Sequence, residues 1–156
     1  MYAATLALHS LIRWLFLFGV GFTVFSAIKG RRSDTPLAGL PRVIGGISVG
    51  LADLQLLLGV LLLAVLSPLR EVFLADPGAA MRDATIRFFV VEHPTLMLLS
   101  ATAMHVGWAR AKRAKTGRAA WNRVLIGFAV GLLLAALAIP WPFLSHARPL
   151  LRLGGG

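Results

Sequence analysis

Hydrophobic residues are concentrated in four segments of the chain, which short polar stretches separate. The segments cover residues 5–28, 43–66, 88–110 and 124–139. At about 1.5 Å of rise per residue, helices of these lengths approach or match a hydrocarbon layer about 30 Å thick. The pattern therefore predicts an all-α integral membrane protein with a single domain, folded as an up-down four-helix bundle.

The loops between these segments differ in charge. Loops 29–42 and 109–123 are strongly basic, whereas residues 67–87 carry three arginines against one glutamate and two aspartates. Short basic loops tend to stay on the cytoplasmic side of a membrane. We therefore expect the two basic loops to be cytoplasmic. Residues 67–87, the tail 144–156 and both termini are then expected outside.

The overall composition agrees with a membrane protein and excludes several kinds of chemistry. Hydrophobic residues make up 58% of the 156 residues, and charged residues only 14%. The net charge of +10 comes mostly from the two basic loops, so it indicates membrane topology, and no nucleic-acid partner is expected. The chain has no cysteine, which rules out disulfides, iron–sulfur clusters and haem attached through cysteine.

Polar residues in the first and third segments are predicted to share one layer near the outer surface. Arg13 follows His9 by four residues, so both lie on one helix face. Glu92 and His93 lie near the outer end of the third segment, and Trp141 follows the fourth at a similar level. Ionisable groups at membrane depth usually face a bundle interior, a partner or a site.

Two readings of this outer layer stay open. In an up-down bundle, His9 and His93 lie on diagonal helices and are able to hold a b-type haem by both axial positions. Arg13 would then lie near a propionate, and Met97, one turn below His93, would line the pocket. Alternatively, His93 only hydrogen-bonds to His9 or a backbone carbonyl, and Arg13 forms an ion pair with Glu92 that fixes the helix register.

A second polar group is expected deeper in the membrane. Gly46 and Gly50 form a small-residue packing motif, and Asp53 lies on the same helix face. Gln55 lies about 200° further round, on the opposite face. Asp53 and His105 are expected to form a buried pair, acting either as a packing contact or as a proton relay.

Enzyme motifs are missing from the sequence. No serine sits in an elbow-type motif, the H-E-x-x-H spacing of zinc proteases is absent, and no glycine-rich loop resembles a phosphate cradle. We therefore expect that the chain is not an enzyme on its own.

Five short motifs together resemble a known family. They are His9-Ser10-x-x-Arg13-Trp14, Leu54-Gln55-Leu56-Leu57-x-Gly59, Arg87-Phe88-Phe89-x-Val91-Glu92-His93-Pro94-x-x-Met97, His105-x-Gly107 and Ile139-Pro140-Trp141-Pro142-Phe143. The set resembles a family of small four-helix bacterial membrane proteins commonly labelled cytochrome b-like. The resemblance implies a haem and the bacterial cytoplasmic membrane. Histidine often stands in that family where this chain has Asp53, which leaves the pair His9 and His93 unaffected.

Two functions follow from these observations. The first is a small b-type cytochrome that moves electrons between a membrane quinol and a redox partner, with haem iron held by His9 and His93. The second is a non-catalytic accessory subunit, without a cofactor, of a larger respiratory or photosynthetic complex. Both functions make the lipid bilayer and other membrane proteins the expected partners.

Overall fold

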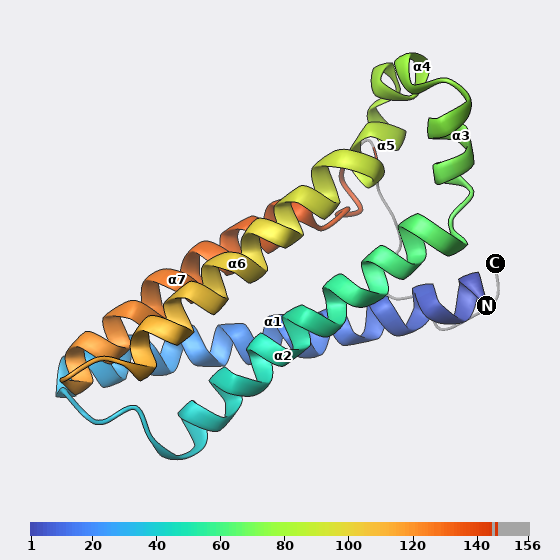
Figure 1. The fold of residues 1–156 in the computed structure, drawn as a ribbon. Helices are drawn as coiled ribbons and strands as arrows, with labels where there is room; N and C mark the ends of the chain where they lie inside the picture. Colours follow the sequence, from blue (N-terminus) through green and yellow to red (C-terminus); the bar gives the residue numbers. More distant parts are fainter. Residues whose placement is uncertain (145, 147–156) are drawn as a thin grey trace.

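The computed structural model describes residues 1–144 and residue 146, and over this part of the chain it is helical without any strand (Figure 1). The four long helices are α1 (Tyr2–Ser33), α2 (Gly39–Leu61), α6 (His93–Lys112) and α7 (Gly117–Ala138). Three short helices connect the two halves: α3 (Leu69–Ala75), α4 (Pro77–Arg82) and α5 (Ala84–Arg87). Two π-helical turns, η1 (Leu62–Leu66) and η2 (Phe88–Glu92), follow α2 and precede α6.

The long helices form two neighbouring pairs. Helix α1 packs against α2 and α7, and α6 packs against α7 and α2. Figure 1 shows that the pair α1 and α2 lies close to the pair α6 and α7 at one end and separates from it toward the other. The short helices α3, α4 and α5 lie at the end where the pairs separate.

Three helical stretches are long and apolar enough to cross a membrane: Tyr2–Ser33, Gly39–Leu66 and Gly117–Ala138. Helix α6, which occupies most of the third expected span, is not among them. It begins only at His93, after the π-helical turn η2, and it contains His105 and a basic C-terminal end. These features shorten the regular helix and lower its hydropathy.

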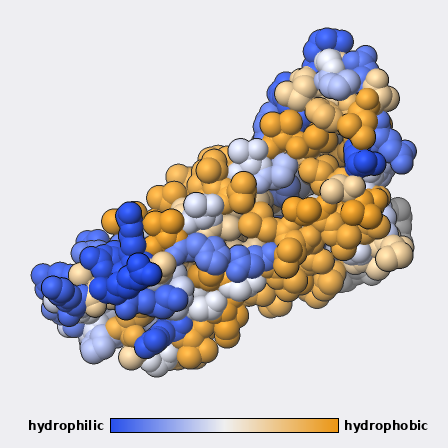
Figure 2. Space-filling view, in the orientation of Figure 1, coloured by the Kyte–Doolittle hydropathy of each residue, from blue (hydrophilic) through white to orange (hydrophobic). Residues whose placement is uncertain are grey.

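On the face that Figure 2 shows, apolar side chains cover most of the middle of the molecule, apart from one hydrophilic stripe, and hydrophilic residues gather at its two ends. Phe18, Leu57, Val65 and Ile126 are each about two-thirds exposed or more, at 72%, 68%, 70% and 67%. Soluble monomers rarely expose contiguous apolar patches of more than a few hundred Å². This apolar belt is compatible with a protein that lies in a membrane.

The two basic loops lie at the same end of the molecule. The indole nitrogen of Trp121 in α7 donates a hydrogen bond to the carbonyl oxygen of Thr35, at 2.8 Å. The carboxylate of Asp34, which ends α1 in a left-handed conformation, accepts from the backbone N–H of Arg118. These contacts tie the loop after α1 to the start of α7.

Glycines set the close crossing of α6 and α7. A Cβ atom added to Gly107 would lie 2.8 Å from the Cα atom of Gly127. One added to Gly127 would lie 2.7 Å from the Gly107 Cα atom and from the carbonyl oxygen of Ala103. One turn away, the buried hydroxyl of Ser100 donates to the carbonyl oxygen of Gly131, at 2.7 Å. Small residues thus allow the two backbones to touch.

The packing motif predicted on α2 holds for Gly46, whose Cβ position would lie 3.7 Å from the Trp108 ring, but is wrong for Gly50. Gly50 is exposed, and nothing lies within 4 Å of where its Cβ atom would be. The closest contacts of α2 are made by Gly45, against Trp108, and by Ser48, against Gly19 of α1. Because one residue corresponds to about 100° of helix rotation, the neighbouring glycine selects a different face.

Candidate functional site

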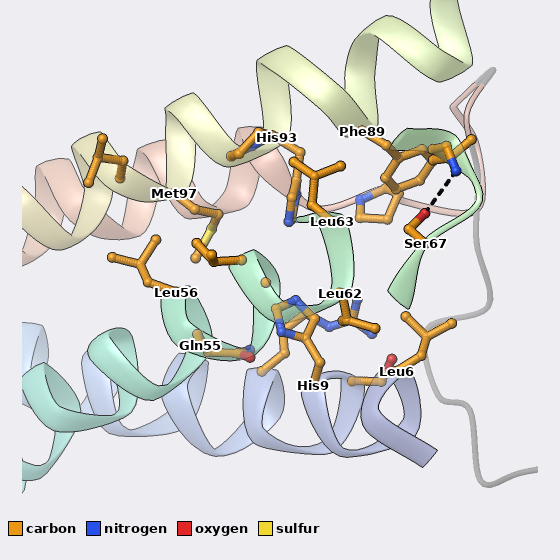
Figure 3. A pocket seen from close by; sticks show the side chains of 18 of the residues that line it. Leu6, His9, Gln55, Leu56, Leu62, Leu63, Ser67, Phe89, His93 and Met97 are labelled. Atoms are coloured by element: carbon orange, nitrogen blue, oxygen red, sulfur yellow. Dashed lines mark hydrogen bonds between the residues drawn. The ribbon is translucent and has the colours of Figure 1, made fainter. Parts of the chain in front are cut away.

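The structure brings His9 of α1 and His93 of α6 together. Their ring centroids lie 6.3 Å apart, and the ring planes make an angle of 67°. Figure 3 shows the two side chains approaching each other from opposite sides of one cavity. Both residues also line that cavity, so the two imidazoles face a common space.

Local backbone structure places His93 at the start of α6. Pro94 has no backbone N–H, so the carbonyl of Val90 lacks its usual α-helical donor. The preceding turn η2 has π-helical spacing, and the backbone N–H of His93 bonds to the carbonyl of Phe88 five residues earlier. Single π-helical turns inside helices are frequent at functional sites.

A backbone carbonyl orients the His93 ring. The Nδ1 atom of His93 lies 2.7 Å from the carbonyl oxygen of Ala138, the last residue of α7. Because a carbonyl oxygen only accepts, Nδ1 carries the hydrogen and donates. In the neutral imidazole the Nε2 atom then holds the lone pair, which is the form that binds a metal ion.

The His9 ring lies against α2. A Cβ atom built on Gly59 would come within 3.7 Å of the His9 Cε1 atom. The Nδ1 atom of His9 is buried and has no hydrogen-bond partner among the described residues. The Oε1 atom of Gln55 is also buried without a hydrogen-bond partner among the described residues. Gln55 lies one turn before Gly59 on α2 and is only 2% exposed.

The cavity between the helices has a volume of about 460 Å³. Its walls are mainly apolar and include Leu6, Leu56, Leu62, Leu63, Phe89 and Met97 (Figure 3). A few polar side chains reach it, among them His9, Arg13 and Gln55. Small-molecule and cofactor sites typically have volumes of about 300–1,000 Å³, apolar walls and a few placed polar groups.

The predicted ion pair between Arg13 and Glu92 is wrong. The Oε1 atom of Glu92 accepts from the Nε atom of Arg87, at 2.7 Å. Arg87 precedes Glu92 by five residues, which are neighbours along a π-helical turn. Arg13 instead lines the cavity, with its guanidinium 5.8 Å from the centre of the Trp14 ring.

Asp53 and His105 form the expected pair, but the pair is not buried. The Nε2 atom of His105 lies 2.7 Å from the Oδ1 atom of Asp53, and both side chains are 49% exposed. The pair joins α2 to α6 away from the cavity, which neither residue lines. Its position on the outside of the helices contradicts the expectation of a buried contact.

Trp141 lies just beyond α7. Its indole nitrogen donates to the carbonyl oxygen of Ala136, at 2.8 Å, and its ring stacks on Phe143. Trp141 does not line the cavity, whereas the neighbouring Pro140 does. Trp141 therefore closes the end of α7, without direct contact with the histidine pair.

Comparison with protein families, curated proteins and solved structures found no match to this chain. Within residues 1–144 and residue 146, no three histidine or carboxylate side chains come close enough to hold a metal ion. A site built from protein ligands alone usually needs three or four of them. The histidine pair is therefore suited only to a metal whose remaining ligands come from elsewhere.

Two parts of the site were not assigned from sequence. The sequence could have pointed to Gln55, because it is a polar residue inside an apolar segment, on the helix face opposite Asp53. The carbonyl of Ala138 gave none, because any residue type supplies a backbone oxygen. Only the folded chain shows that the end of α7 meets His93.

Proposed function

We propose that the protein is a four-helix transmembrane cytochrome that holds a b-type haem between His9 and His93. In this proposal α1, α2, α6 together with η2, and α7 each cross the membrane. The observation that carries it is the histidine pair, 6.3 Å apart across a cavity of about 460 Å³.

The separation of the rings would allow His9 and His93 to hold one haem iron between them. A bond from a metal to an imidazole nitrogen is about 2 Å long, so two opposed nitrogens lie about 4 Å apart and the ring centroids about 6 Å apart. The observed centroid distance is 6.3 Å. The angle of 67° between the planes is compatible with this arrangement, because two rings that share one axis can lie at any angle to each other.

The surroundings of the histidines also fit a haem. Four iron ligands come from the porphyrin itself, so the two histidines complete the set. The apolar walls suit the macrocycle, and Met97 and Leu56 are among them. Arg13 at the same cavity supplies a positive charge for a propionate. The bonded Nδ1 atom of His93 matches the usual support of a metal-binding histidine by a second group.

A haem bound here supplies one-electron redox chemistry. The residues of this chain orient it, exclude water from it through the apolar walls, and set its potential. The proposed role is to pass electrons between a membrane quinol and a redox partner in the bacterial cytoplasmic membrane. The resemblance to the family labelled cytochrome b-like agrees with this role and stays a prediction.

The test is a reduced-minus-oxidised absorption spectrum of the detergent-purified protein, with haem extracted and quantified from the same sample. We expect a sharp reduced alpha band and close to one haem per chain. His93→Ala should abolish both. His105→Ala is the matched control, since His105 lies away from the cavity, and it should keep the haem. A folded protein without haem, or equal loss in the two variants, would overturn the proposal.

A second candidate function is that of an accessory subunit in a larger membrane complex. The observation in its favour is the half-exposed pair Asp53 and His105, which lies outside the cavity on the outer side of α2 and α6. Polar groups that face lipid are costly, so a transmembrane helix of a partner protein would cover them. The partner helix would carry a hydrogen-bonding side chain at this depth.

Affinity purification in mild detergent tests this second function. The wild-type chain should carry a defined membrane partner, and the double variant Asp53→Leu, His105→Leu should lose it. The variant Leu99→Ala alters an exposed apolar residue of α6 that does not line the cavity, and it serves as the control. Identical co-purification by the wild type and the double variant would exclude this face as the contact.

A further inference from the structure

His9 and Gln55 each bring a buried polar atom without a hydrogen-bond partner to the cavity. These atoms are the Nδ1 atom of His9 and the Oε1 atom of Gln55, and neither has a hydrogen bond within the described part of the chain. Gln55 is 2% exposed, so water does not easily compensate it. Buried polar groups are normally hydrogen-bonded, and an exception calls for an explanation.

The two atoms are complementary in chemistry. An amide oxygen only accepts a hydrogen bond, and one ring nitrogen of a neutral histidine always donates. They also share a location, because the His9 ring approaches Gly59 of α2 and Gln55 lies four residues earlier on the same helix face. Figure 3 shows the side chains of His9 and Gln55 directed toward the same cavity.

His93 has a hydrogen-bond acceptor for its Nδ1 atom, whereas His9 has none among the described residues. His93 already donates from Nδ1 to the carbonyl of Ala138, which fixes its ring and leaves Nε2 for a metal. Histidine ligands of metals almost always have such an acceptor on the second ring nitrogen. On the His9 side, Gln55 brings an unused acceptor to the cavity beside an unused ring nitrogen.

We propose that Gln55 is the positioning residue of His9: its Oε1 atom accepts the Nδ1–H of His9 and directs Nε2 toward the haem iron. The inference rests on the proposed haem site. An acceptor on Nδ1–H makes the imidazole a stronger electron donor, which stabilises ferric over ferrous iron. Gln55 thereby lowers the reduction potential of the haem.

Two substitutions test this role in the full-length, detergent-purified protein. Gln55→Leu removes the acceptor, and Gln55→Glu keeps the shape while it strengthens the acceptor. The measurement is a potentiometric titration of the reduced alpha band. Loss of a supporting group weakens metal binding by about tenfold or more. If that loss falls on ferric haem, the potential of Gln55→Leu rises by about 59 mV for one electron.

The sign of the two shifts separates positioning from simple packing. We expect a higher potential for Gln55→Leu and a lower one for Gln55→Glu than for wild type. Leu57→Met, a volume-conserving change at an exposed position of α2 outside the cavity, is the matched control and should leave the potential unchanged. Because Gln55→Glu is nearly isosteric, it decides the question even when Gln55→Leu fails to fold.

The outcomes distinguish this inference from the proposed function. A wild-type protein without an alpha band overturns the haem site and the role of Gln55 together. A normal alpha band with both variants at the wild-type potential overturns the role of Gln55 alone. So does a shift of both variants in the same direction, which would indicate a packing defect.

Discussion

The crossing of α6 and α7 predicts that Gly127→Ala is strongly destabilising. The added Cβ atom would lie 2.7 Å from the Cα atom of Gly107 and from the carbonyl oxygen of Ala103. Both are backbone atoms, so no side chain is available to rotate away. To reach an ordinary contact distance of 3.4 Å, the helices must separate locally by at least 0.7 Å.

This displacement sets the expected loss of stability in Gly127→Ala. A gap of about 0.5–1 Å forfeits roughly a quarter to a half of each dispersion contact across it. Overpacking of a tight interior typically costs about 1–3 kcal/mol. Replacing glycine by alanine inside a helix also stabilises the fold by about 0.5–1 kcal/mol, because alanine loses less backbone entropy on folding. A control variant must correct for this gain.

Gly50→Ala is that control. Gly50 also lies inside a helix, but nothing lies within 4 Å of its Cβ position. The gain in helix propensity is common to both variants, so their difference isolates the steric cost. We expect Gly127→Ala to be less stable than Gly50→Ala by about 1–3 kcal/mol.

The assay is unfolding by sodium dodecyl sulfate in mixed micelles, followed by far-ultraviolet circular dichroism. Gly50→Ala should unfold at or above the wild-type detergent fraction, and Gly127→Ala well below it. Equal stability of the two variants would refute the close crossing. Greater damage from Gly50→Ala would instead mean that the outer face of α2 is packed against another chain.

Two further predictions concern the contact at the basic end and the orientation of the chain in the membrane. Trp121→Phe removes the hydrogen bond to the Thr35 carbonyl and should lower the free energy of unfolding by about 1 kcal/mol in the same assay, whereas unchanged stability would show that this contact is dispensable. A reporter inserted in the loop 113–116 should be cytoplasmic and one inserted at 76–84 should be outside, as measured by compartment-specific activity; the reverse pattern would overturn the predicted orientation.

The broad architecture followed from sequence because it depends on long, redundant signals. Each apolar segment contains many residues that agree with one another, so helices α1, α2 and α7 appear close to where they were expected. The third segment agreed less well, because it has a proline and several polar residues. There the chain forms η2 and begins its regular helix only at His93.

The orientation of α2 was harder to predict. The Gly46 and Gly50 motif indicated one face, but the closest contacts are made by Gly45 and Ser48, and Gly50 makes none within 4 Å. Small residues occur at several neighbouring positions of α2, and a shift of one residue turns the face by about 100°. Without knowledge of the partner helix, nothing in the sequence selects among these faces.

The two histidines of the candidate site could be predicted from the sequence. The groups that hydrogen-bond to them or pair with their neighbours could not. His9 and His93 stood out as ionisable residues in apolar segments at one depth. The pairing of Glu92 depended on the π-helical turn, which brings Arg87 rather than Arg13 beside it. Backbone acceptors such as the Ala138 carbonyl carry no sequence signal at all.

The hydrogen bond from His93 to Ala138 has a consequence for how the protein is made. Residues 9 and 93 leave the ribosome well before residue 138, the last residue of α7. A nascent chain that ends before that point holds both imidazoles, yet nothing fixes the His93 ring or closes the wall at Pro140. The arrangement of the cavity seen here is therefore complete only once α7 has been synthesised.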